Sequence, residues 1–273
     1  MTNALDLPAL AREIKSAHDA STQIEPLSAR AGGLDMAGAY EIARIVHQQR
    51  LQEGRRAVGR KIGFTNAALW PVYGVHEPIW GPMYDSSVVY LDEGRGRCGL
   101  GRFTEPKIEP EIVFHLSKTP PQDADLQTLL GCIDWVAHGF EIVQSRYPLW
   151  KFKAADTVAD GALHAALLVG PRCAVASLGA GLIDALKDFT ITLSRNGQLE
   201  ESGQGSAVLG HPLAALAHLL QVLTTQPMQP ALQAGETVTT GTLTQARDVR
   251  AGETWSTVLE GINLPGLSVA FSD

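Results

Sequence analysis

Short β-rich runs separated by Gly and Pro fill the chain from residue 58 onward, and this pattern constrains the fold more than any other feature. Runs of about four to eight β-forming residues bounded by turn residues are typical of strands, which bury their apolar side chains by pairing in sheets. The preceding segment differs, because its apolar residues recur at the three- and four-residue spacing of helices. We therefore expect two parts: an N-terminal helical region at residues 1–57 and a β-roll domain at residues 58–273.

Several segments carry signals for helix ends and turns. Asp35 is a predicted N-cap and Gly54 a predicted stop for one helix of the N-terminal region. Asn196-Gly197, between two strand-like runs, predicts a hairpin because both residues tolerate the positive φ of a type I′ turn. The order is neither regular βαβ nor all-β, so we expect an α+β protein, a mixed and largely antiparallel roll with peripheral helices. The expected helices are 7–20, 35–53, 126–137 and 212–224, and the expected strands are 58–65, 87–91, 107–116, 139–144, 162–169, 189–194, 198–202, 237–242, 256–260 and 267–271.

Composition limits the class of protein and its partners. A chain of 273 residues buries enough surface to fold without disulfides or a structural metal. The net charge of −7 speaks against nucleic acid and anionic membranes as partners, but it leaves a small anionic substrate open. The three cysteines have no CxxC spacing, and the chain shows neither secretory signal features nor an apolar run of about 20 residues. We expect a soluble cytoplasmic protein with reduced thiols.

Residues 105–116, EPKIEPEIVFHL, combine an apolar strand face with a charged one. Alternation along the strand places Lys107, Glu109 and Glu111 on the same face, with the two carboxylates roughly 7 Å apart. Like charges this close, if shielded from water, raise a pKa or require a cation, and Mg²⁺ prefers such oxygen ligands. The alternative is a solvated strand face that carries its charges without a ligand.

A third acid and a lysine lie in similar settings. Glu141 stands in GFEIV, a run too apolar for a surface edge, and a buried glutamate needs a partner. Three carboxylates on two strands can close one face of an octahedral metal site and leave positions for a chelating substrate. Lys61 in GRKIGFT shares a strand face with Gly63 and Thr65, which leaves room for a ligand, although a surface lysine fits the same pattern.

A set of motifs then occurs together and in order along the chain. In this combination the chain resembles the fumarylacetoacetate hydrolase superfamily, in particular its branch of 2-keto-4-pentenoate (2-hydroxypentadienoate) hydratases and 4-oxalocrotonate decarboxylases. The resemblance extends from the helical region to the C-terminus, and it implies a mixed β-sandwich roll with an N-terminal helical region and assembly into homo-oligomers. The motifs are GRKIGFT, VHEPIWG at 75–81, KIEPEI, GFEIVQSRY, DTVAD at 156–160, SAVLGHPLAAL at 206–216 and TTGTL at 239–243.

The resemblance also implies roles for particular residues. Glu109, Glu111 and Glu141 match the carboxylates that hold Mg²⁺ or Mn²⁺ in this family, and Lys61 matches a catalytic lysine beside the substrate. Asp85 matches an aspartate near the family pocket and is expected to act in catalysis. The expected substrate-binding residues are Lys151, Thr240, Gly241 and Thr242.

The implied function is that of a divalent-metal-dependent lyase, a hydratase that adds water to a small anionic 2-hydroxydienoate or 2-oxo-enoate of aromatic meta-cleavage catabolism. A 4-oxalocrotonate-type decarboxylase is the first alternative, because the same enolate stabilisation serves both reactions. An acylpyruvate C–C hydrolase ranks below the decarboxylase, because that reaction usually needs a His–Glu pair in the helical region and His47 and Glu53 do not form a convincing one. A non-catalytic family member is the last alternative.

The segment that follows Arg146 departs from the family pattern. Tyr147 and residues 150–152 resemble the decarboxylases, whereas the spacing of Trp150 before DTVAD is closer to the hydratases. Both groups usually continue DTVAD with Asn-Ala-Ser, where this chain has Gly161-Ala162-Leu163. The amide and hydroxyl expected near the substrate are therefore missing, and the natural substrate is expected to differ from the simple pentadienoate.

Overall fold

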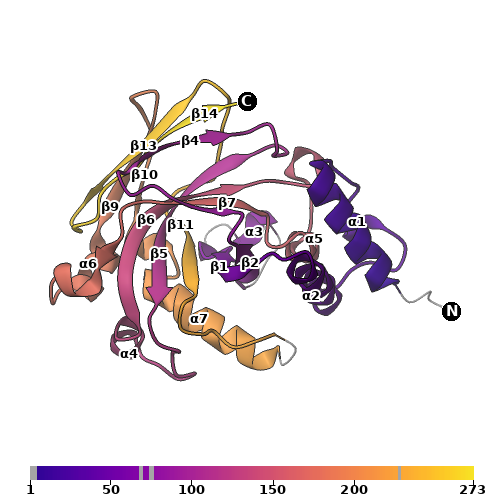
Figure 1. The fold of residues 1–273 in the computed structure, drawn as a ribbon, viewed down its shortest axis with the longest axis horizontal. Coiled ribbons are helices and arrows are strands. Elements are labelled where there is room, and N and C mark those ends of the chain that lie inside the picture. Colours follow the sequence, from indigo (N-terminus) through magenta and orange to yellow (C-terminus); the bar gives the residue numbers. More distant parts are fainter. Residues whose placement is uncertain (1–4, 68–69, 74–76, 227–228) are drawn as a thin grey trace.

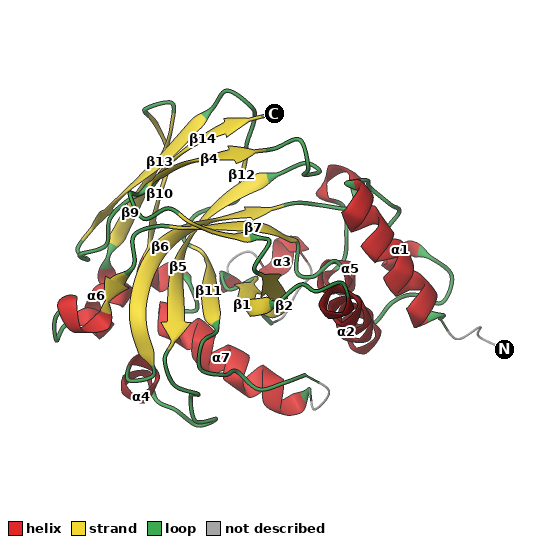
Figure 2. Cartoon of the chain, in the orientation of Figure 1, coloured by secondary structure: helices red, strands yellow, loops and turns green. Residues whose placement is uncertain are grey.

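Two sheets form the body of the protein in the computed structural model, which describes residues 5–67, 70–73, 77–226 and 229–273 (Figures 1 and 2). The strands are β1 Ala57–Gly63, β2 Ile79–Tyr84, β3 Val88–Tyr90, β4 Arg95–Gly99, β5 Lys107–Leu116, β6 Ile133–Val143, β7 His164–Val169, β8 Cys173–Ala174, β9 Thr190–Arg195, β10 Gln198–Gln204, β11 Thr237–Thr242, β12 Arg247–Asp248, β13 Thr254–Glu260 and β14 Ser268–Ser272. The helices are α1 Leu7–Ala20, α2 Met36–Gln52, α3 Trp70–Tyr73, α4 Leu126–Leu130, α5 Ala154–Ala159, α6 Leu182–Asp188 and α7 Pro212–Thr225.

A nine-stranded sheet has the order β2-β1-β11-β5-β6-β7-β3, with β12 and β8 paired to β5 and β6, and a five-stranded sheet has the order β10-β9-β13-β14-β4. Most neighbours are antiparallel, and three pairs, β1 with β11, β3 with β7 and β4 with β14, are parallel. Figure 1 shows the five-stranded sheet lying over the curled larger sheet. The predicted α+β fold, a mixed and largely antiparallel roll, is confirmed.

The alternating pattern of β5 divides its side chains between two environments. Ile108 packs with Phe140 of β6 and Trp255 of β13, which joins the two sheets. Ile112 and Phe114 pack instead against the leucines of α7. The odd-numbered face of β5 carries the glutamates and points away from these two cores, as its sequence predicted.

The N-terminal helices form where their capping residues predicted them. Asp35 accepts a hydrogen bond from the Gly38 N–H at 2.8 Å and begins α2, and Gly54 follows its end at φ +85°. Ile14 of α1 and Ile42 of α2 are buried in one cluster that also contains residues of α5. The division into residues 1–57 and 58–273 stays a prediction.

The predicted helix over 126–137 is wrong beyond Leu130. Gly131 ends α4, and from Ile133 the chain runs as β6, which pairs antiparallel with the whole length of β5. The Leu and Ile spacing suggested a helix, but pairing with a buried strand outweighs such a weak local preference. Strands β2 and β4, rich in Gly, Pro and Arg, were not predicted, nor were the short helices α5 and α6. The Asn196-Gly197 hairpin between β9 and β10 is confirmed, with both residues at positive φ.

One stretch in the described part of the chain, Gly205–Thr225, is long and apolar enough to cross a membrane, contrary to our expectation from run lengths. Half of its most apolar window is buried inside the protein. Leu213, Leu216 and Leu219 of α7 are fully buried against β5 and β11. Packing of this kind explains the apolar composition of α7 as that of a core helix.

Candidate active site

Three carboxylates converge on the odd-numbered face of β5 and the facing part of β6. The strand register places Glu109 directly opposite Glu141, and Glu111 follows two residues along the same face. One oxygen from each carboxylate lies within 4.8 Å of the other two. Glu111 Oε1 and Glu141 Oε2 are buried and accept no hydrogen bond from any described residue. Glu141 Oε2 has the Lys61 ammonium beside it, so Glu111 Oε1 is the unpartnered oxygen of the set. A buried oxygen of this kind fits a hard divalent cation, which takes oxygen ligands.

The pKa values of these carboxyls show how unfavourable three bare negative charges are at this position. Burial raises the pKa of Glu109 and of Glu141 to about 7, although the nearby Lys61 ammonium acts in the opposite direction. Burial and then the charge of Glu141 raise the pKa of Glu111 well above its ordinary value. A cation held between the carboxylates would supply the missing positive charge.

Lys61 of β1 lies beside this carboxylate set. Its ammonium Nζ is 3.3 Å from Glu141 Oε2, and its side chain is almost fully buried. Burial alone would lower the pKa of Lys61, but Glu141, Glu109 and Glu111 outweigh it and the pKa is raised. A Cβ at Gly63 would lie 3.3 Å from Lys61 Nζ, so the glycine leaves space for the ammonium group. Lys61 is therefore a buried cation at neutral pH.

The end of β11 contacts the carboxylate set through its backbone. The register against β5 shifts between Thr239 and Thr242, and at this bulge the Gly241 N–H donates to Glu111 Oε2 at 2.7 Å. The hydroxyl of Thr240 donates to the Ile112 carbonyl at 3.2 Å, and that of Thr242 donates to the Thr244 carbonyl at 2.8 Å. These two hydroxyls are thus engaged with the backbone, while the Gly241 amide holds Glu111.

A cavity of about 80 Å³ opens beside the carboxylates. Its polar lining includes Lys61, Glu109 and the backbone at Gly241 and Thr242. Thr65, Asn66 and Lys107 also line it, and its apolar wall includes Ile79, Val143, Trp150, Phe152, Ala162 and Leu163.

Two of the predicted site residues, Asp85 and Lys151, belong neither to the carboxylate set nor to the lining of this cavity. The Asp85 carboxylate accepts a hydrogen bond from Arg56 Nε at 2.9 Å and does not line the cavity. Lys151 is exposed, whereas its neighbours Trp150 and Phe152 line the cavity. The structure therefore brings together Lys61, the three glutamates and the 240–242 turn, but not Asp85 or Lys151.

Comparison with known proteins agrees with this geometry. Residues 86–264 match the family model described as fumarylacetoacetate (FAA) hydrolase C-terminal. The chain belongs to the fumarylacetoacetate hydrolase family. It is 34% identical over 242 residues to 2-hydroxyhexa-2,4-dienoate hydratase of Comamonas testosteroni, with 88% of each chain covered, and 34% identical over 265 residues to 2-keto-4-pentenoate hydratase 2 of Dechloromonas aromatica (strain RCB), with 96% of this chain and 97% of the relative covered.

The fold is similar to that of 4-oxalocrotonate decarboxylase from Pseudomonas putida G7 complexed with magnesium and adipate. The TM-score is 0.87 with 28% sequence identity, and 97% of each chain is covered. A second structure of that decarboxylase, complexed with calcium and acetate, has a TM-score of 0.85 with 26% identity. The family and the fold expected from the motifs are both confirmed.

The sequence reasoning missed His164 in this family member. His164 Nδ1 lies 2.8 Å from Glu141 Oε1, and His164 Nε2 lies 2.9 Å from Ser87 Oγ. Burial, and then the charge of Lys61, lowers the pKa of His164 to about 3, so the imidazole is neutral. A neutral ring with partners on both nitrogens fixes the Glu141 carboxylate. The sequence held no spacing signal, because the contact joins β6 to the first residue of β7.

Lys107 is a second cation that lines the cavity. The sequence analysis had placed it on the same face of the strand as Glu109 and Glu111. Its ammonium lies 4.5 Å from the centre of the Trp150 ring and 3.5 Å from Asp248 Oδ1. Lys107 thus occupies the rim of the cavity, where the sequence analysis had expected Lys151.

Proposed function

We propose that this chain is a divalent-metal-dependent hydratase that adds water to a 2-hydroxydienoic acid, or to its 2-oxo-enoate form, from aromatic meta-cleavage catabolism. The observation that carries the proposal is the convergence of Glu109, Glu111 and Glu141 with Lys61 beside a cavity that has an apolar wall. The hydratases that are 34% identical over most of the chain support this reaction class.

Glu109, Glu111 and Glu141 would hold Mg²⁺ or Mn²⁺. The fit rests on an all-oxygen donor set in which the buried Glu111 Oε1 has no hydrogen-bond partner within the described residues. The magnesium and calcium in the structures of the related decarboxylase support the same choice of a hard cation. When bound, the ion supplies Lewis-acid stabilisation of charge on the substrate's C1 carboxylate and C2 oxygen.

Lys61 orients the substrate and supplies a proton. In the reaction, the dienol loses its hydroxyl proton at C2 and gains one at C5, which leaves a C3=C4 double bond conjugated with the C2 carbonyl. Water then adds its oxygen to C4, and a proton is delivered to C3. The buried Lys61 ammonium donates a hydrogen bond to the oxygen on which negative charge develops. His164 and the Gly241 N–H keep Glu141 and Glu111 in position.

Decarboxylation is a second candidate, and Lys107 favours it. A 4-oxalocrotonate-type substrate carries a second carboxylate at its far end, and an ammonium group on the cavity rim can pair with it. Lys107 already interacts with Asp248 and Trp150, and the side chains of Ile79 and Leu163 suit an uncharged tail better. Hydration therefore stands first.

Two substrates distinguish the reactions. The protein with Mg²⁺ is incubated with 2-hydroxypenta-2,4-dienoate in H₂¹⁸O, and with 2-hydroxymuconate, while the diene absorbance is followed. Loss of the band with ¹⁸O incorporated at C4 is the expected result. Release of CO₂ from 2-hydroxymuconate without hydration would replace the hydratase with the decarboxylase, and no turnover of either compound would refute both.

A cytoplasmic location and assembly into a homo-oligomer complete the proposal. The three cysteines are free thiols, which supports a reducing compartment, and the family resemblance supports the assembly. Light scattering on the purified protein measures the subunit number, and a monomer would contradict the homo-oligomer.

A further inference from the structure

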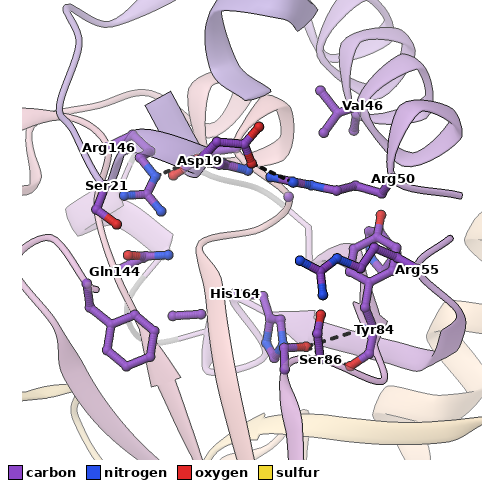
Figure 3. Close-up of a pocket in the computed structure, with 18 of the residues that line it drawn as sticks. Asp19, Ser21, Val46, Arg50, Arg55, Tyr84, Ser86, Gln144, Arg146 and His164 are labelled. Atoms are coloured by element: carbon purple, nitrogen blue, oxygen red, sulfur yellow. Dashed lines mark hydrogen bonds and ion pairs between the residues drawn. The ribbon is translucent and has the colours of Figure 1, made fainter. Parts of the chain in front are cut away.

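A second cavity, of about 400 Å³, lies where the N-terminal helices meet the larger sheet (Figure 3). Its walls come from the end of α1, one face of α2, the turn into β1, strand β2 and the segments that follow β6 and α5. It shares no lining residue with the cavity of about 80 Å³ beside Glu109. His164 links it to the carboxylate set, because its ring lines the second cavity while its Nδ1 contacts Glu141.

Hydrogen-bond donors dominate its lining. The Arg146 side chain is only 3% exposed; its Nη1 donates to Thr104 Oγ1 at 3.0 Å, and its buried Nε has no hydrogen-bond partner within the described residues. Gln144 is also buried, and its Oε1 accepts from the Thr104 N–H at 3.2 Å, which leaves the amide NH₂ as its free end. Figure 3 shows Arg50 and Arg55 directed toward the same space from the opposite wall.

The acidic groups of this wall are mostly engaged. Asp19 pairs with Lys15 at 2.6 Å and with Arg50 at 2.5 Å. Asp160 Oδ1 lies 2.5 Å from His18 Nε2 and 3.9 Å from Arg146 Nε, while its Oδ2 is buried without a hydrogen bond.

The arginines of the lining outnumber these acids. The lining carries two aspartates and the arginines Arg50, Arg55, Arg102 and Arg146. The Arg55 backbone N–H donates to the Arg50 carbonyl at 3.0 Å, but the Arg55 side chain forms no hydrogen bond or ion pair with the part of the chain that the structure describes. Positive charge and free N–H groups therefore exceed the acceptors available to them.

We propose that this cavity binds a small organic acid through its carboxylate. Guanidinium and amide N–H groups select anionic acceptor oxygens, and a cavity of this volume suits a small molecule. Val46, Phe103 and Ala165 supply apolar lining, so the ligand carries a short carbon chain and is not a bare inorganic anion. The inference goes beyond the proposed hydratase and does not depend on it.

Isothermal titration with succinate tests the site, both with Mg²⁺ and with EDTA. We expect one succinate site per chain that persists in EDTA, where the glutamates hold no metal to chelate a carboxylate. Arg55→Gln is the informative variant, because the Arg55 side chain makes no described hydrogen bond or ion pair and the substitution keeps the backbone N–H bond to Arg50, so we expect the fold to stay intact. It is expected to weaken succinate binding about tenfold or more, since a charge-assisted hydrogen bond is lost.

Arg97→Gln is the matched control. Arg97 is an exposed arginine of β4 outside the cavity, so the variant makes the same charge change and should bind succinate like the unaltered protein. Equal affinity of the Arg55 and Arg97 variants would overturn the proposal, as would the absence of succinate binding at about 10 mM. Inorganic phosphate binding as tightly as succinate would refute the choice of an organic acid. The titration measures succinate binding and not catalysis. If the protein failed to hydrate dienoates in the assay of the proposed function, the outcome of the titration would still decide this proposal.

Discussion

Replacing Gly241 by Ala tests whether the bulge in β11 holds the proposed metal ligands. Gly241 has φ +96°, and a Cβ built on it lies 1.9 Å from Thr65 Oγ1. Holding an L-residue at positive φ costs about 1–2 kcal/mol, and overfilling a packed site costs about 1–3 kcal/mol more. We expect the free energy of unfolding to fall by about 2–5 kcal/mol, as measured by urea denaturation.

The same substitution also disturbs Glu111. Relief of the overlap with Thr65 moves the Gly241 N–H, which donates to Glu111 Oε2 at 2.7 Å. Loss of a group that orients a metal ligand typically weakens metal binding by about 10–100-fold. Isothermal titration with Mg²⁺ measures this second effect separately from the loss of stability.

Gly235→Ala is the matched control. Gly235 has φ +90°, but a Cβ there meets nothing within 4 Å. Its expected cost is therefore about 1–2 kcal/mol from the backbone alone, with unchanged affinity for Mg²⁺. Equal losses of stability in both variants, together with Mg²⁺ affinity like that of the unaltered protein, would refute the idea that this bulge positions Glu111.

Three further predictions concern the same site. The double variant Glu109→Gln with Glu111→Gln should lose tight Mg²⁺ binding in titration and turnover in the diene assay; an unimpaired double variant would contradict the metal role. His164→Gln should weaken Mg²⁺ binding about 10–100-fold, whereas His115→Gln, at a surface histidine that pairs with an aspartate, should not. Lys61→Met should abolish turnover while Mg²⁺ binding is kept or strengthened, since a cation beside Glu141 is removed; normal turnover would exclude Lys61 from the chemistry.

Local pattern and tertiary structure agree in the segments that the sequence predicted well. The bounds of α1 and β5 were predicted to the residue, because the helical spacing in one and the alternation in the other match the face that each element buries. The helix prediction for 126–137 was wrong in its second half because the Leu and Ile residues there fit both the helical and the strand period. Pairing with β5 makes this part of the segment a strand. Pairing of this kind joins distant residues and leaves no local signal.

The candidate site shows the same division. Alternation placed Glu109 and Glu111 on one face, and the strand-like runs GFEIV and GRKIGFT singled out Glu141 and Lys61 before the family motifs gave them roles. The register of such strands is fixed by their apolar side chains. The contact of His164 with Glu141 depends on how β6 and β7 pair, and no spacing rule contains it. Asp85 and Lys151 were expected from motif position alone. Asp85 pairs with Arg56 after β2, and Lys151 is exposed although both of its neighbours, Trp150 and Phe152, line the cavity.

The net charge of the chain speaks against polyanionic partners but does not describe either proposed site. At the proposed metal centre, three carboxylate charges would be balanced by the Lys61 ammonium and a divalent cation, so the centre as a whole would be neutral and would not repel an anionic substrate. At the second cavity, four arginines face two aspartates within one lining, and the excess acidic residues of the chain lie elsewhere. Because charges on the surface are screened by salt over about 10 Å, a small acid responds to the local balance at each cavity, while an extended polyanion responds to the acidic surface as a whole.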